Sequence, residues 1–198
     1  MLTDQERMQA SQIQTRMRAD LARAEASGDL NHDARNRLRA RAVIRARAEM
    51  AELRQAADAR HASDTAQAYK AAFGLRPDRA AEDRSYRDSL ATKPPNVSQA
   101  QGLFAQAQAR GDELAMTALA EFAWINRGEP GGHWIELLGQ YGDVSPAYDR
   151  AIRDLIALTE PDRRMQITDK LQTEIVAPPD LQHGNLEAMA AQPIAADV

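Results

Sequence analysis

A long segment without glycine or proline places the strongest constraint on how this chain folds. Neither residue occurs between Gly28 and Gly74, and Asn31 can cap a helix that starts directly after it. We therefore expect one helix over residues 32–73. At a rise of about 1.5 Å per residue this helix is about 60 Å long, far longer than the average helix of a globular protein.

A shorter helix is predicted before it, over residues 4–27. Thr3 and Glu6 have the spacing of a capping box, and Gly28 marks the end of the helix. Because the turn to the next helix is short, we expect an antiparallel hairpin whose first arm is about 36 Å long. Small and apolar residues recur at steps of three and four and form a narrow seam of Ala10, Ile13, Met17, Leu21 and Ala24.

The long helix carries a similar seam of small and apolar residues. Since the first helix is too short to cover the second, roughly half of the long helix needs cover from the rest of the chain or from another molecule. The seam therefore predicts a protein-interaction surface. Its members are Leu38, Ala42, Ala46, Met50, Leu53 and Ala57.

Arginines form a stripe on another side of the same helix, at Arg37, Arg41 and Arg45. Three interpretations are open: a solvated surface in which arginine stems cover alanine, electrostatic docking onto an acidic protein surface, and contact with a phosphate backbone. No aromatic residue that could stack on bases occurs between residues 1 and 68. Of the two functional interpretations, docking onto protein is therefore favoured over nucleic acid.

The rest of the chain also predicts helices and no convincing strand. The expected fold class is all-α, with an N-terminal antiparallel helical hairpin that has one long helix and then a small C-terminal helical bundle. The predicted domains are the hairpin or coiled-coil arm (1–76), a linker with a short helix (77–97), the small helical bundle (98–176) and a loosely ordered tail (177–198).

The aromatic residues of the second half predict the main core there. Ser98 can cap the first helix of this bundle. The last helix of the bundle is expected over about 161–176. Its apolar residues are predicted to face inward: Met165, Ile167, Leu171 and Ile175.

Several kinds of chemistry find no support in the sequence. There is no cysteine, which excludes a thiolate metal site, an iron–sulfur cluster and a cysteine nucleophile. The glycines at 128–132 match no phosphate-binding loop, and no Gly-x-Ser-x-Gly elbow occurs. His133 and Glu136 are spaced as half a metal site, without a second such pair. We therefore expect no enzyme activity, no cofactor and no metal.

Charge is unevenly distributed along the chain. Residues 1–99 hold 18 basic and 14 acidic residues, whereas residues 100–198 hold 7 basic and 15 acidic residues. The two halves could attract each other, or copies could associate head to tail, although ordinary surface composition also explains such a difference.

Taken together, these features predict a non-catalytic assembly, scaffolding or structural protein that oligomerises or docks on a protein partner through its long helix. A structural component of a phage or virus would be one such protein. The alternative is a nucleic-acid-associated protein or regulator that uses the arginine-rich segment 35–47. The polar N-terminus does not resemble a signal peptide, and no apolar stretch is long enough to cross a membrane. The expected location is therefore the cytoplasm, or the virion in the case of a phage component.

Overall fold

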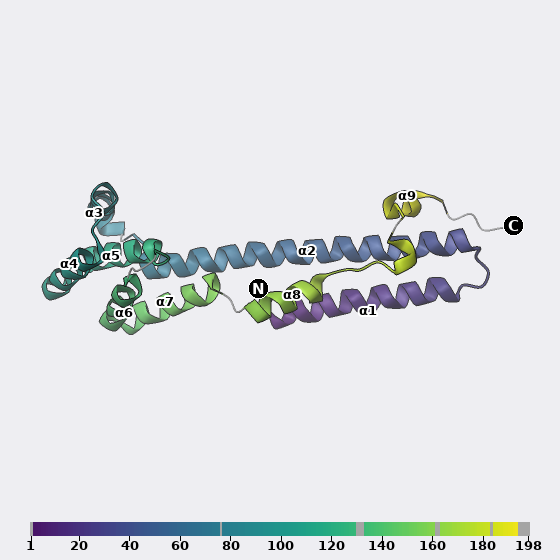
Figure 1. The fold of residues 1–198 in the computed structure, drawn as a ribbon, viewed down its shortest axis with the longest axis horizontal. Coiled ribbons are helices and arrows are strands. Elements are labelled where there is room, and N and C mark those ends of the chain that lie inside the picture. Colours follow the sequence, from purple (N-terminus) through teal and green to yellow (C-terminus); the bar gives the residue numbers. More distant parts are fainter. Residues whose placement is uncertain (1, 76, 130–132, 161–162, 183, 194–198) are drawn as a thin grey trace. The chain divides into compact units, whose positions relative to one another are not determined.

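The computed structural model of the protein describes residues 2–75, 77–129, 133–160, 163–182 and 184–193. Within these ranges the regular elements are helices and none is a strand, which confirms the predicted all-α class (Figure 1). Two short 3-10 turns cover Pro77–Arg79 and Pro179–Leu181. The helices are α1 (Asp4–Ala26), α2 (His32–Phe73), α3 (Ala80–Thr92), α4 (Val97–Arg110), α5 (Glu113–Asn126), α6 (Trp134–Val144), α7 (Pro146–Thr159), α8 (Arg163–Thr173) and α9 (Leu186–Ala191).

The starts of the first two helices follow from local capping. The amide of Glu6 donates to Thr3 Oγ1 at 3.2 Å, and the amide of Thr3 donates to Glu6 Oε2 at 2.6 Å, which completes the predicted capping box. The amide of Ala34 donates to Asn31 Oδ1 at 2.8 Å and begins α2 as predicted. The predicted cap at Ser98 is wrong, because α4 starts at Val97, two residues before the start that a cap at Ser98 implies, and its capping residue is Asn96.

The chain divides into two compact units. Unit 1 combines residues 1–61 with 161–198, and unit 2 consists of residues 62–160. The first part of α2 therefore belongs to unit 1 and its last part to unit 2. This grouping differs from the predicted division into 1–76, 77–97, 98–176 and 177–198. The reason is that the chain returns to its N-terminal helices after α7, and no local pattern signals such a return.

Unit 1 is built on α1 and the first part of α2, which run antiparallel. Ion pairs join Arg60 to Glu6 at 3.0 Å and Arg16 to Glu49 at 3.3 Å, so a later position on α1 faces an earlier position on α2. Figure 1 shows the two helices side by side. The C-terminal segment, which we define as the described residues from 174 to 193, packs against both helices. The buried core that the three parts share consists of Ala10, Ile13, Met17, Ala40, Val43, Ala46, Met50, Ile175, Ala177, Leu181 and Leu186.

The segment predicted as a loosely ordered tail, 177–198, contributes residues to the core of unit 1. Ala177, Leu181 and Leu186 are buried in the core of unit 1, and α9 forms within the segment. Its apolar residues are separated by prolines and polar residues, so they show no helical or strand periodicity from which burial could be predicted. Residues 183 and 194–198 of the predicted tail lie outside the described residues.

Unit 2 contains the last part of α2 and the helices α3 to α7. The side chain of Tyr141 is fully buried at its centre, where its ring stacks on Tyr148 with 4.5 Å between centroids. Its hydroxyl donates to the carbonyl oxygen of Ala72 at 2.9 Å, which satisfies a carbonyl at the end of α2. The segment predicted as a linker with a short helix, 77–97, contains the helix α3, whose Leu90 is part of this core.

Candidate protein-interaction surface

The predicted contact seam on α2 is covered by the protein's own chain. Ala42, Ala46, Met50 and Ala57 are buried, and Met50 is only 1% exposed. Leu38 and Leu53 are partly buried. The C-terminal segment and α1 cover this part of α2, while Phe73 at its far end is buried in unit 2. The chain itself thus covers the seam, and the prediction that the seam contacts a partner is not supported. Residues 58–71 of α2, between the seam and the buried end of the helix, include no buried residue.

The predicted arginine stripe is also occupied within the chain. Arg37 Nη1 donates to the carbonyl oxygen of Pro193 at 2.6 Å. Arg41 donates to the carbonyl oxygens of Ala190 at 2.8 Å and Gln192 at 2.7 Å. The last carbonyls of a helix lack partners in the helix itself, so Arg41 caps the end of α9. Two arginines of the stripe thus hold the C-terminal segment.

Arg45 lies in a groove between α1 and α2. Asp20 pairs there with Arg45 at 3.7 Å and with Arg23 at 3.0 Å, so one carboxylate faces two cations. The groove has a volume of about 290 Å³. It brings together members of both predicted sets, and its lining consists of Asp20, Arg23, Ala24, Ser27, Leu38, Arg41, Ala42 and Arg45.

Arg39 has a structural role that the sequence did not predict. Its guanidinium donates two hydrogen bonds to the carboxylate of Asp180, at 2.6 and 3.0 Å. These hydrogen bonds from Arg39 lower the pKa of Asp180 below its ordinary value. The pair fixes the turn Pro179–Leu181 against α2. No sequence signal connects the two residues, because they are 141 positions apart.

The helix α8 is oriented opposite to its prediction. Its polar residues Asp169 and Thr173 are buried, whereas Ile167 is 61% and Leu171 65% exposed. Met165 is 36% exposed. Ile175, which follows the end of the helix, is buried. The predicted inward orientation is therefore wrong for Met165, Ile167 and Leu171, and of the four predicted residues only Ile175 is buried.

Hydrogen bonds to the N-terminal residues explain this orientation. Asp169 accepts the backbone amide of Leu2 at 2.8 Å and Nε of Arg7 at 3.1 Å. The hydroxyl of Thr173 donates to the carbonyl oxygen of Asp169 at 2.8 Å. The hydrogen bond with Asp169 raises the pKa of Arg7 above its ordinary value. A buried carboxylate needs such partners, so Asp169 determines which side of α8 faces α1.

The opposite side of α8 is both apolar and basic. Arg163, Ile167, Lys170 and Leu171 are all exposed and lie on one side of the helix, since residues three and four positions apart are neighbours on a helix surface. We call these four residues the α8 outer face. This face exposes two aliphatic and two cationic side chains, which are available for contact with another molecule.

A polar cluster in unit 2 has a structural explanation. Arg87 donates to the buried Asp83 at 2.6 Å and to the carbonyl oxygen of Phe73 at 2.8 Å, and it pairs with Glu121. The hydroxyl of Tyr69 donates to the same Glu121. Burial raises the pKa of the Tyr69 phenol. Arg87 therefore caps the last carbonyl of α2 and links this helix to α3 and α5. Asp83, Glu121 and Tyr69 all take part in this packing contact.

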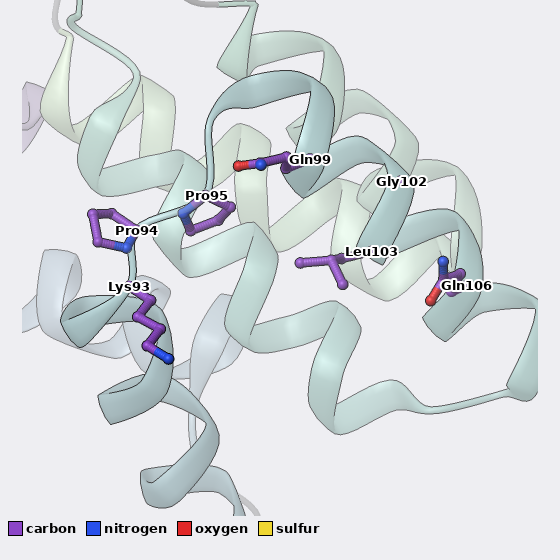
Figure 2. A pocket seen from close by; sticks show the side chains of 7 residues that line it. All are labelled: Lys93, Pro94, Pro95, Gln99, Gly102, Leu103 and Gln106. Atoms are coloured by element: carbon purple, nitrogen blue, oxygen red, sulfur yellow. The ribbon is translucent and has the colours of Figure 1, made fainter.

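A surface hollow lies between the start of α4 and the segment that precedes it (Figure 2). It has a volume of about 540 Å³. Its polar groups are one amine and two amides, without a carboxylate, hydroxyl or imidazole that could act as a general base. The lining residues are Lys93, Pro94, Pro95, Gln99, Gly102, Leu103 and Gln106.

The histidine with metal-ligand spacing lies in an ordinary surface pair. His133 Nδ1 is 2.9 Å from Glu136 Oε1, and both side chains are largely exposed. Among the described residues, no group of three or more His, Cys, Asp or Glu could hold a metal ion. None of the helices in the described ranges has the length and apolarity that crossing a bilayer demands.

No family model, curated protein or solved structure matches this chain. Its function must therefore be inferred from its own residues.

Proposed function

We propose that the protein is a non-catalytic helical assembly protein that associates with other copies of itself through the α8 outer face. The observation that carries the proposal is the reversed orientation of α8, with Asp169 buried and Ile167 and Leu171 exposed. Burial of a leucine or isoleucine side chain contributes about 1.5–3 kcal/mol, so this orientation leaves a substantial favourable contribution unused in the single chain. An association that covers the outer face recovers it.

The polar groups of the molecule support a structural role. Asp169 and Arg39 are buried, and each joins segments that are far apart in the sequence. Asp83 is the most buried charged group in the part of the chain that the structure describes, and its partner Arg87 joins α3 to the end of α2 and to Glu121 of α5. The hydrogen bonds of these residues lie within one unit or the other and stabilise that unit. They do not converge on a common reaction centre. This arrangement favours a protein that acts by binding through its surface and not by catalysis.

Nucleic-acid binding is less well supported. It would use Arg37 and Arg41, but these residues donate to carbonyl oxygens of the C-terminal segment. Contact with phosphates would have to replace those hydrogen bonds. The proposed assembly surface, in contrast, uses side chains that are already exposed.

Sedimentation velocity and light scattering test the proposal over a range of protein concentrations. We expect the wild-type protein to self-associate and the double variant Ile167→Glu/Leu171→Glu to lose association by at least about tenfold, because charges would be buried in an apolar contact. Gln12→Glu/Gln67→Glu is the matched control, since it adds the same charge at exposed positions on α1 and α2, outside α8. This control is expected to associate like the wild type.

Circular dichroism of each variant establishes that its helices are intact. A wild-type protein that stays monomeric at every concentration would refute the proposal. So would a folded Ile167→Glu/Leu171→Glu variant that associates as strongly as the control.

A further inference from the structure

We infer that the α8 outer face of one copy binds the outward side of α6 of a second copy, in a head-to-tail contact. This inference rests on the proposed function and names both the partner and its surface. Three observations carry it: the composition of the two helix surfaces, their opposite charges, and an open glycine position on α6.

The outward side of α6 is apolar and acidic. Its buried side is formed by Trp134, Leu137, Leu138 and Tyr141, and the opposite side exposes Ile135, Glu136, Gly139 and Asp143. We call these four exposed residues the α6 outer face. Ile135 is 68% exposed, and α6 contains no basic residue.

Within the described ranges, the contacts of Glu136 do not involve a permanently charged cation. Glu136 accepts a hydrogen bond from Gln101 at 3.3 Å and lies beside His133, but it faces no arginine or lysine in these contacts. The α6 outer face thus presents a negative surface beside an exposed isoleucine.

The charges of the two faces select the pairing. The α8 outer face carries Arg163 and Lys170, so two α8 faces in contact would repel each other, as would two α6 faces. An α8 face against an α6 face places cations opposite carboxylates. This contact joins different surfaces of the two copies, and such a heterologous contact produces a ring if it closes and a filament if it does not.

The shapes of the two faces are also compatible. Ile135 and Gly139 are four positions apart on α6, and Ile167 and Leu171 have the same spacing on α8, which suits the packing of ridges formed by residues at that spacing. A Cβ atom added at Gly139 would meet nothing within 4 Å, so packing inside the chain does not require a glycine there. The absence of a side chain at Gly139 lets a large side chain of a partner, such as that of Leu171, approach the α6 backbone beside Ile135.

Charge reversal in trans tests the pairing. Variant A is Arg163→Glu/Lys170→Glu, and variant B is Glu136→Lys/Asp143→Lys. Each variant alone places like charges opposite each other, and we expect its self-association to weaken by at least about tenfold. In an equimolar mixture, the α8 face of A meets the α6 face of B with reversed charges, and the α8 face of B meets the α6 face of A with the original charges. The mixture should therefore associate within about threefold of the wild type.

Matched controls carry the same charge changes at exposed positions away from both faces. These are Arg18→Glu/Arg47→Glu for variant A and Asp88→Lys/Asp154→Lys for variant B. Both controls are expected to associate like the wild type, and sedimentation velocity measures all samples at one salt concentration.

The outcomes separate this inference from the proposed function. If Ile167→Glu/Leu171→Glu abolishes association but variant B associates like the wild type, α8 is the contact surface and α6 is not its partner, which overturns the inference alone. A mixture of A and B that remains as weak as each variant also overturns it. A monomeric wild-type protein overturns both the inference and the proposed function.

Discussion

The orientation of α8 depends on a buried carboxylate, and its removal gives a quantitative prediction. Arg7 interacts with two carboxylates, Asp169 at 3.1 Å and Asp4 at 3.0 Å. The side chain of Asp169 is 12% exposed and that of Asp4 is 97% exposed. The same guanidinium therefore allows a comparison of a buried and an exposed partner at nearly equal distance.

The expected cost of Asp169→Ala follows from the bonds that it breaks. Asp169 accepts hydrogen bonds from the Leu2 amide and from Arg7, and a hydrogen bond to a charged group contributes about 1.5–3 kcal/mol. Burying the carboxylate offsets part of this gain, so we expect Asp169→Ala to lower the free energy of unfolding by about 2–4 kcal/mol. Asp4→Ala removes an exposed ion pair and a charge at the start of α1, which is expected to cost less than about 1 kcal/mol.

Urea unfolding followed by two signals measures this difference. Both tryptophans lie in unit 2, at positions 124 and 134, so their fluorescence reports on that unit, whereas far-ultraviolet circular dichroism reports on the helices of both. Asp169→Ala should shift the circular dichroism transition to lower urea by more than it shifts the fluorescence transition. If Asp169→Ala and Asp4→Ala have the same effect within about 1 kcal/mol, the buried carboxylate does not fix α8 and the reasoning is refuted.

Three further predictions concern Tyr69, the arginine stripe and binding of nucleic acid. Burial raises the pKa of Tyr69, so the folded protein retains the phenol proton to higher pH than the unfolded chain. The stabilisation is present below the ordinary tyrosine pKa of about 10 and is lost as the pH rises through the folded value, and Tyr69→Phe should make the decline of unfolding free energy above about pH 10 less steep. An unchanged slope in thermal unfolding across that pH range would contradict this prediction. The triple variant Arg37→Glu/Arg41→Glu/Arg45→Glu should release the C-terminal segment and increase its cleavage in limited proteolysis, because the carbonyls of Ala190, Gln192 and Pro193 lose their donors. The wild-type protein is expected not to bind DNA or RNA even at about 50 mM salt, and binding that the triple variant abolishes would favour the nucleic-acid alternative.

Local signals were sufficient to predict the helices of the N-terminal half. The capping box at Thr3 and Glu6 and the cap at Asn31 each act within three residues, so the sequence alone contains the interaction. The periodicity of α2, from which a protein-interaction seam was predicted, marked a side of the helix that is largely buried, and Met50 on that side is almost fully inaccessible. The prediction erred on what covers it, because periodicity identifies an apolar side and not its neighbour.

Long-range pairs determined the features that could not be predicted. Asp169 binds the amide of Leu2 from 167 positions away, and this contact outweighs the apolar pattern that predicted Ile167 and Leu171 as inward residues. Arg41 likewise meets carbonyls of a segment that has no hydrophobic period. The placement of the sequence in a phage or virus and its cytoplasmic location stay predictions.

The division of α2 between the units has a consequence for synthesis of the chain. All of unit 2 is translated before Ile175, Ala177, Leu181 and Leu186, which complete the core of unit 1. Domains tend to fold as units while the chain emerges from the ribosome. Unit 2 can thus fold before the core around Met50 is complete. A stop codon just after α7 would leave unit 1 without the C-terminal segment that completes this core.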